Sequence, residues 1–287
     1  MRNRVWLSSG VSAVALSAAV LLAAPGLPVS AQGTQTPPAT APAKPPAKAP
    51  AQGAAKAQPA PNAELPAART IIDRHIQAIG GRKAILGHQS TKITGTVTVS
   101  GNGMSGNFEI LAMKPDKALS KVTLGGIGDL VEGYDGTHAW SSSPMTGPML
   151  SQGKELEQRK FDADFYGELH DPARYTSITT AEKTTFQGRP CYKLSLVRKD
   201  GAEDFDFYDV ETGLKAGTIA TRESPMGAVT STVWQGDYKK FGDVLQPTTI
   251  RQTNTGVELV MKVSTVEYDG VPPATFEAPA AIKALIK

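Results

Sequence analysis

The chain of 287 residues contains a single cysteine, Cys191. It therefore cannot form an intrachain disulfide, and it has no cysteine near its start to which a lipid could be attached. A nucleophilic cysteine needs a positioned histidine and an exposed, electropositive setting. The surrounding Arg189-Pro190-Cys191-Tyr192 has the pattern of a strand instead, so we interpret Cys191 as a small, packed hydrophobic residue.

Long apolar runs are also missing. The N-terminal apolar stretch, Val11 to Ala24, has only 14 residues before a proline, whereas a membrane span needs about 20. Two arginines precede this stretch, and small residues follow it at positions 29–31. This pattern predicts a signal peptide over residues 1–31, cleaved after Ala31. We therefore expect an exported chain that works in the periplasm rather than one held by a membrane anchor.

Residues 32–63 lack acidic and aromatic side chains and contain 11 alanines, eight prolines and three lysines. Such a segment cannot bury enough apolar surface to offset the entropy of ordering it. We expect a disordered Ala/Pro-rich linker that serves as a spacer. The alternative is that its lysines contact an anionic surface such as lipid headgroups.

The remaining residues, 64–287, lack an excess of positive charge. They hold 25 basic and 27 acidic residues, a net charge of −2, because five of the 30 basic residues precede position 64. A nucleic-acid surface needs a dense basic face. The charge balance therefore argues against a nucleic-acid partner.

Familiar catalytic and metal-binding motifs are missing as well. There is no Gly-x-Ser-x-Gly sequence, and no two histidines lie within four residues of each other, so a helical metal pair is excluded. We expect no catalytic residue, no metal and no cofactor. Surface or capping roles are predicted for all four histidines: His75, His88, His138 and His170.

Two partial motifs are explained by strands. Gly101, Gly103 and Gly106 match the spacing of a dinucleotide-binding loop, but residues 107–112 alternate as a strand where a helix is required. An aspartate group at positions 204, 206 and 209 lacks the glycine and the distal glutamate of a calcium loop. We predict that these aspartates lie on a solvated strand face.

Alternation of apolar and polar residues with period two dominates residues 64–287, which we expect to form one domain. Short Gly-, Asn- and Asp-containing turns separate the alternating runs, which predicts antiparallel hairpins. About ten strands in one sheet must curl because twist accumulates. We expect the apolar side to be concave and to leave a cavity, the usual place for a hydrophobic ligand.

Two helices are predicted. The first follows Pro66, repeats isoleucine at spacings of four and three, and ends at Gly80-Gly81. The second covers about Glu155 to Leu169 and places Phe161 and Phe165 on one side. Its aspartates at positions 162 and 164 are assigned to the solvated side. Both helices are expected to plug the concave face.

Two loops place methionine beside proline, at residues 143–150 and 224–227. Flexible apolar side chains on irregular backbone suit the mouth of a cavity, and they suit the cap of a core equally well. The tryptophans are more typical of core or rim packing. The predicted cavity and rim residues are Trp140, Met145, Met149, Leu150, Phe161, Phe165, Met226 and Trp234.

Taken in order along residues 68–278, several short motifs resemble the LolA/LolB-like superfamily of outer-membrane lipoprotein-sorting proteins. They are Ala78-Ile79-Gly80-Gly81-Arg82-Lys83-Ala84, Thr94-Gly95-Thr96-Val97, Lys114-Pro115-Asp116-Lys117, Tyr134-Asp135-Gly136-Thr137-His138-Ala139-Trp140, Gly188-Arg189-Pro190-Cys191-Tyr192-Lys193-Leu194 and Tyr208-Asp209-Val210-Glu211-Thr212-Gly213-Leu214. The resemblance implies an incomplete antiparallel β-barrel of about eleven strands, a mainly β (α+β) fold with helices closing one side. It also implies an interior that holds acyl chains and no catalytic residues. The long Ala/Pro linker is not part of the plain carrier.

The leading hypothesis is a periplasmic, non-catalytic protein that holds the acyl chains of a lipid or an acylated lipoprotein, with peripheral membrane contact. The alternative is an envelope interaction or stress-sensor module whose cavity is closed and whose partner is a protein. An enzyme is the third hypothesis. It would require a cluster of perturbed acid and base groups, which no sequence pattern indicates.

Overall fold

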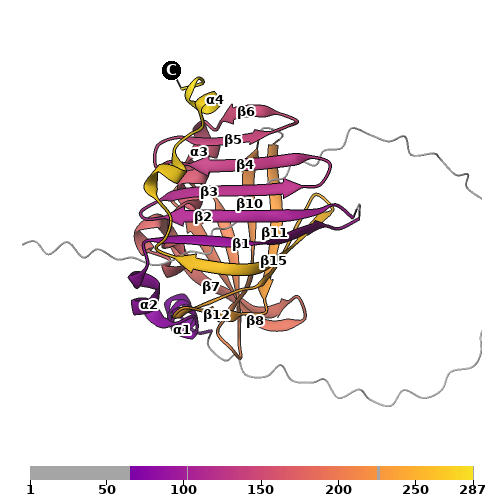
Figure 1. Ribbon diagram of the computed structural model, residues 1–287. Helices are drawn as coiled ribbons and strands as arrows, with labels where there is room; N and C mark the ends of the chain where they lie inside the picture. The colour runs from indigo at the N-terminus through magenta and orange to yellow at the C-terminus, as the bar shows by residue number, and fades with distance from the viewer. Residues whose placement is uncertain (1–64, 102, 225–226, 287) are drawn as a thin grey trace, which may run out of the picture. The chain divides into compact units, whose positions relative to one another are not determined.

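The computed structural model in Figure 1 describes residues 65–101, 103–224 and 227–286. The predicted signal peptide and linker lie outside these residues, and so does Met226. Predictions about those segments, including the cleavage after Ala31 and the domain limits, stay predictions.

In the described part of the chain, 13 strands form one antiparallel sheet and two more form a separate hairpin. The sheet strands are β1 (Ser90–Val99), β2 (Ser105–Met113), β3 (Lys117–Leu124), β4 (Gly128–Tyr134), β5 (Ala139–Ser143), β6 (Gly147–Leu150), β7 (Tyr175–Phe186), β8 (Arg189–Arg198), β9 (Glu203–Asp209), β10 (Lys215–Ser224), β11 (Gly227–Gly236), β14 (Thr249–Asn254) and β15 (Val257–Tyr268). The hairpin consists of β12 (Lys239–Phe241) and β13 (Val244–Gln246).

The sheet has two arms that meet at β15. One arm runs outward from β1 through β2, β3, β4 and β5 to β6, and the other runs from β14 through β11, β10, β9 and β8 to β7. Because β6 and β7 are both edges, the sheet does not close into a barrel. The predicted incomplete antiparallel barrel is confirmed, with more strands than the eleven expected.

Turn chemistry accounts for the hairpins. Between β9 and β10, the Asp209 side chain accepts hydrogen bonds from the backbone N–H groups of Glu211 and Thr212 at 3.0 and 2.7 Å. Gly213 then takes a φ of 75°, a conformation that disfavours side chains. This local bonding reverses the chain without help from the rest of the fold.

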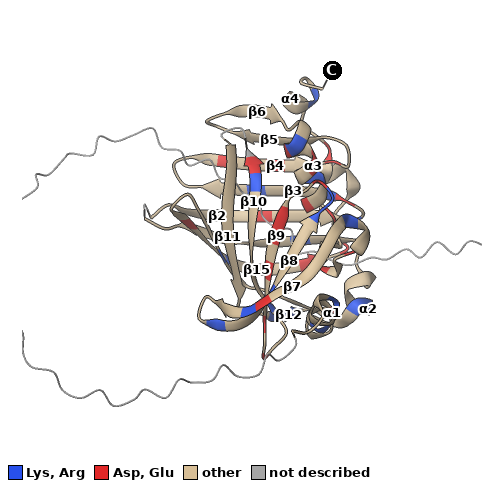
Figure 2. Cartoon of the chain, turned by 180° about the vertical axis from the view of Figure 1, so that it is seen from behind, with Lys and Arg blue, Asp and Glu red and all other residues tan. Residues whose placement is uncertain are grey.

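The sheet curls strongly. In Figure 1 the strands β1–β6 lie in front of β10 and β11, and Figure 2 shows the reverse view. The pairing of β1 with β15 shifts register between Thr94 and Gly95, and such bulges increase local twist. A Cβ on Gly95 would lie only 2.0 Å from the Lys262 carbonyl oxygen and 2.7 Å from the Phe108 ring. The bulge therefore leaves no room for a side chain at position 95.

The helical elements are short. They are α1 (Ala68–Ala78), α2 (Gly81–Gly87), α3 (Gly153–Asp162), α4 (Ala280–Lys283) and the 3-10 turns η1 (Gly167–Leu169), η2 (Pro172–Arg174) and η3 (Pro273–Phe276). Helix α1 confirms the first predicted helix. It buries an isoleucine stripe against β8 and β9, and Gly80 follows it with a φ of 129°.

The second predicted helix is shorter than expected, because α3 ends at Asp162 and only η1 resumes the helical path. Asp164 accepts a hydrogen bond from the Tyr166 backbone N–H at 3.0 Å, and the Phe165 N–H bonds the Pro115 carbonyl at 3.0 Å. Both bonds take backbone donors that a continuing helix would use. The first is made by a short polar side chain, which often competes with the helix in this way.

The helices cover opposite faces of the sheet. Glu132 on β4 faces inward and pairs with Arg159 of α3, which contacts both β5 and β10. Trp140 on β5 faces outward and packs with Ile282 of α4. Since neighbouring residues alternate between faces, α3 fills the concave side and α4 covers the outer side of the same arm.

Strand β9 reverses the predicted polarity. Asp204 and Asp206 point inward and are 7% and 3% exposed, whereas Phe207 packs on the outer face against Phe186 with ring centroids 4.1 Å apart. The prediction of a solvated aspartate face was therefore wrong. Asp162, expected in solvent, is also largely covered, with a side chain 9% exposed.

Candidate functional site

An apolar cavity of about 70 Å³ lies on the concave face. Side chains from both arms of the sheet line it: Ile93, Phe108, Ile110, Val233, Ile250, Val263 and Val266, with Pro247 and three glutamines. The bulge opposite Gly95 turns both Val263 and Val266 inward, although they are three positions apart and would face opposite sides of a regular strand. These side chains form the apolar part of the concave face.

A second cavity, of about 90 Å³, adjoins the first and is strongly polar. The two cavities share Glu168, Lys215 and Thr218 as lining residues. A register shift between Lys215 and Gly217 brings Lys215 and Thr218 to the same face of β10. A backbone irregularity thus places a lysine where the apolar and polar cavities meet.

Four ionisable side chains, which we call the buried quartet, lie at this junction: Glu168, His170, Asp206 and Lys215. The Lys215 Nζ lies 3.0 Å from Asp206 Oδ2 and 3.7 Å from Glu168 Oε1. His170 Nε2 lies 3.0 Å from Asp206 Oδ2. His75 flanks the quartet, with its Nε2 3.4 Å from Glu168 Oε2.

Polar contacts hold both histidines at this junction. His170 Nδ1 lies 2.9 Å from the Glu168 carbonyl oxygen and Nε2 faces the Asp206 carboxylate. His75 Nδ1 accepts the Lys215 backbone N–H at 3.2 Å, and its Nε2 faces the Glu168 carboxylate. Contacts at both ring nitrogens therefore fix the orientation of each histidine.

The groups around Glu168 and Asp206 explain why these carboxylates stay ionised. Burial opposes the ionisation of Glu168, but the Lys215 ammonium and the hydrogen bond with His75 outweigh burial and lower its pKa to about 2. Burial acts likewise on Asp206, where Lys215 and His170 hold the pKa well below its usual range. Thr218 adds a hydrogen bond of 2.6 Å to Asp206. Compensated charge, rather than solvent, stabilises these groups.

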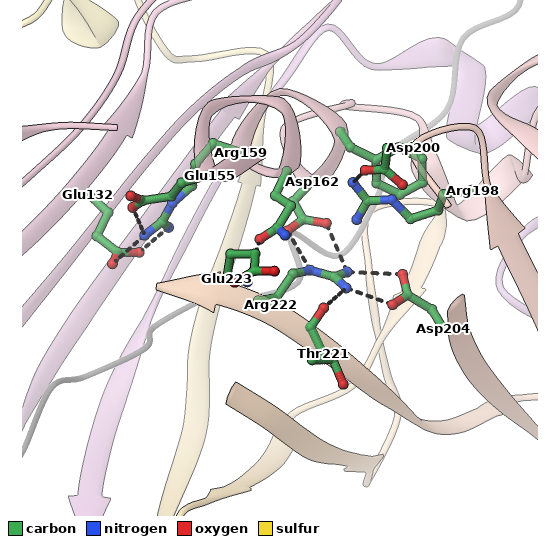
Figure 3. Close-up of polar contacts among 12 residues, drawn as sticks. Glu132, Glu155, Arg159, Asp162, Arg198, Asp200, Asp204, Thr221, Arg222 and Glu223 are labelled. Atoms are coloured by element: carbon green, nitrogen blue, oxygen red, sulfur yellow. Dashed lines mark hydrogen bonds and ion pairs between the residues drawn. The ribbon is translucent and has the colours of Figure 1, made fainter. Parts of the chain in front are cut away.

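Helix α3 is attached to the sheet mainly by ion pairs (Figure 3). Arg222 of β10 contacts Asp162 at 3.1 Å and Asp204 at 2.6 Å. On the other arm, Arg159 makes two contacts to the Glu132 carboxylate, at 2.5 and 2.9 Å. In Figure 2 the red segments of β9 lie near the blue segments of β10 and α3. The two arms are therefore bridged through one polar helix.

The histidine prediction was wrong for two of the four residues. His75 and His170 are 2% and 3% exposed and belong to a buried acid–base cluster. Sequence spacing could not reveal it, because its members come from α1, η1, β9, β10 and the residue after η1. Within the described ranges, no group of three or more His, Cys, Asp or Glu side chains is arranged to hold a metal ion.

The predicted cavity and rim residues do not gather at one place. Phe161 lines the polar cavity, and Phe165 is fully buried in the core beside α1. Trp140 and Leu150 pack beneath α4 on the outer face, and Trp234 packs on the outer face beside Phe207. Met145 is 54% exposed and Met149 is half-buried. The lining valines and isoleucines were missed, although period-two alternation marks most of them.

Cys191 is fully buried, and burial raises the pKa of its thiol to about 11. Its interpretation as a packed small residue is confirmed. Among the helices of the described segments, none combines the length and apolar character needed to cross a bilayer.

The comparisons with known proteins agree with this architecture. A LolA superfamily protein from Nitrosomonas europaea superposes with a TM-score of 0.50 at 12% identity, covering 75% of this chain and 99% of that protein. The chain has a LolA-like fold. A DUF1329 family protein from Desulfovibrio piger also superposes on it with a TM-score of 0.50, at 14% identity over 73% of this chain and 97% of its own. No protein-family model and no curated protein sequence matches the chain.

Proposed function

We propose that this LolA-like protein binds the acyl chain of a lipid or an acylated lipoprotein in the periplasm and performs no chemistry on it. The observation that carries the proposal is the apolar cavity formed by seven aliphatic and aromatic side chains of the concave face. Each methylene transferred from water to such a surface contributes about 0.8 kcal/mol. The predicted export signal supports this proposal, because an exported chain would meet envelope lipids.

The size of the cavity limits how much ligand it encloses. An apolar cavity of about 150 Å³ holds a benzene-sized molecule, and this cavity measures about 70 Å³. In this structure the cavity has room for only the tip of an acyl chain. A longer chain requires the two arms or the covering helices to separate, and the ion pairs of α3 are the contacts that resist this movement.

Native mass spectrometry of the exported chain, purified without detergent, combined with displacement of a fluorescent fatty acid, tests the proposal. Val263→Phe fills the cavity, whereas Val260→Phe changes an equally half-buried valine on the opposite face of β15. We expect Val263→Phe to weaken fatty-acid binding about tenfold, as the loss of two buried methylenes would. Val260→Phe should bind normally. Absence of both co-purifying lipid and displaceable fatty acid would overturn the proposal.

The small enclosed volume favours a second candidate, an envelope interaction module with a closed cavity. This candidate predicts a different outcome, because Val263→Phe would then leave binding of the protein partner unchanged. A protein partner captured equally by wild type and Val263→Phe, with no lipid in either sample, would support it.

A further inference from the structure

A third cavity, of about 410 Å³, lies between α3, η2 and the turns that follow β2 and β8. It shares Phe161, Asp164 and Arg174 with the polar cavity, and it shares no lining residue with the apolar one. Its chemistry is therefore separate from that of the proposed acyl-chain site.

Arg198, the last residue of β8, is the most unusual group in the wall of this cavity. It is 1% exposed, and within the described residues its Nε and Nη1 have no hydrogen-bond partner. Only Nη2 is paired, with Asp200 Oδ2 at 2.5 Å (Figure 3). Its guanidinium carbon lies 3.8 Å from the centre of the Phe161 ring. A buried donor left unpaired costs about 1–3 kcal/mol, so this guanidinium favours an additional acceptor.

The same wall carries further charges that lack partners. In the described part of the chain, neither Lys160 nor Lys199 forms an ion pair within 4 Å, and neither Asp116 nor Glu157 does. Asp116 is half-buried, and burial, opposed by Lys160, raises its pKa. A partly desolvated carboxylate without an ion pair favours a cation.

Positive and negative groups in the wall are equal in number: Lys160, Arg174, Arg198 and Lys199 against Asp116, Glu157, Asp164 and Asp200. A simple anion would be attracted to Arg198 and Lys199 but repelled by the unpaired carboxylates. A simple cation would meet the reverse problem. A ligand that carries both a negative and a positive charge can pair with the basic side chains and with the carboxylates at the same time.

We propose that this cavity binds a zwitterion in which an oxyanion such as phosphate is joined by a short linker to a primary ammonium. The oxyanion contacts Lys199 and accepts hydrogen bonds from Nε and Nη1 of Arg198, the two donors that lack partners within the described residues. It reaches them when the short turn that carries Asp200 moves aside; the Asp200 side chain is 37% exposed. The ammonium contacts Asp116 and Glu157. A quaternary ammonium is disfavoured because it needs several aromatic faces, and Phe161 is the only aromatic residue that lines this cavity in the described structure.

Calorimetric titration of the full exported chain at low salt tests this assignment. The probes are O-phosphoethanolamine, inorganic phosphate, ethanolamine and phosphocholine. We expect O-phosphoethanolamine to bind at least about tenfold more tightly than the other three, since each charge-assisted hydrogen bond contributes about 1.5–3 kcal/mol. Equal or weaker binding of O-phosphoethanolamine than of phosphate overturns the proposal.

Variants separate the two charges. Asp116→Asn should weaken O-phosphoethanolamine about tenfold and leave phosphate unchanged or tighter, whereas Lys199→Gln should weaken both. Asp129→Asn on β4 and Lys183→Gln on β7, which lie away from the cavity, are the matched controls and should bind as wild type. Thermal melts check that each variant is folded. An equal loss of both ligands in Asp116→Asn would contradict the assignment.

A fifth probe shows whether the zwitterion is a lipid headgroup or a free solute. The affinity for dihexanoyl phosphatidylethanolamine, measured below the concentration at which it forms micelles, is compared with that for O-phosphoethanolamine. Tighter binding than O-phosphoethanolamine identifies a lipid headgroup, and equal binding identifies a free solute. Binding of the lipid with none of O-phosphoethanolamine overturns the site, because the affinity then comes from the acyl chains. Fatty-acid displacement is measured separately, so failure of this site and failure of the acyl-chain proposal are distinguishable.

Discussion

At the scale of single residues, the burial of charge in this protein is explained by pairing rather than by exposure. Lys215, Asp206 and Glu168 each carry a full charge in the concave face. Each of the three has an opposite charge within 3.7 Å, and His170 Nε2 lies 3.0 Å from Asp206 Oδ2. Removing one member therefore leaves an uncompensated charge rather than a simple cavity.

We expect Lys215→Met to lower the free energy of unfolding by about 3–5 kcal/mol, the usual cost of breaking a buried pair. Urea unfolding measures it. Lys262→Met, at a lysine with a 59% exposed side chain, is the control and should change stability by less than about 0.5 kcal/mol. The double variant Lys215→Met/Glu168→Met should recover part of the loss, because Glu168 is then no longer a buried charge left without its lysine partner. If the loss of unfolding free energy in the double variant equals the sum of the losses in Lys215→Met and Glu168→Met, the two residues do not stabilise each other and the proposed pairing is wrong.

At the scale of elements, side-chain contacts hold together segments that are distant in the chain. His88, just after α2, bonds Asp269 at the end of β15 through Nδ1 and Asp243 in the β12–β13 turn through Nε2, both at 2.8 Å. Its ring stacks on Tyr268 with centroids 4.0 Å apart. Burial lowers the pKa of His88, but hydrogen bonds to the two aspartates outweigh it and raise the pKa above 6.5.

This contact predicts a pH dependence of stability. Since the folded pKa of His88 lies above the unfolded value of 6.5, the stabilisation is complete below pH 6.5 and is lost as the pH rises through the folded pKa. Unfolding free energies measured from below pH 6.5 into the alkaline range should fall more steeply in wild type than in His88→Asn. His138→Asn is the control and should keep the wild-type slope. Parallel curves for wild type and His88→Asn would refute the prediction.

The elements themselves were largely predictable. Isoleucine periodicity and Gly80-Gly81 marked α1, and alternation with turn residues marked the strands, because these signals are local. The end of α3 was not predictable, since the Phe165 N–H is taken by Pro115 from a distant turn. The buried cluster was missed for the same reason: its side chains meet only after α1, η1, β9 and β10 pack together.

At the scale of the whole molecule, curling of the sheet determines which residues share the interior. The two arms approach at β1 and β15, where Gly95 leaves room for the Phe108 ring and the Lys262 carbonyl. The apolar cavity lies between these arms. A side chain at position 95 would therefore disturb pairing and cavity together.

Gly95→Ala should destabilise the protein by about 3 kcal/mol, because the added Cβ clashes with backbone that cannot move independently. Thermal unfolding measures the effect. Gly87→Ala is the matched control, since a Cβ at Gly87 would meet no atom within 4 Å; it should be neutral or slightly stabilising. Similar melting temperatures for the two variants would show that the sheet relaxes freely at the bulge.

The sequence by itself determined the class of fold: its alternating runs, Asp- and Gly-containing turns and isoleucine stripe act over neighbouring residues. Only the tertiary structure decided which face of each strand is interior. Bulges at Gly95 and Lys215 shift the alternation, and α3 supplies Asp162 as a partner for Arg222 beside Asp204. Alternation specifies that two faces differ, but only the packed partners determine whether a charged face turns toward water or toward opposite charges.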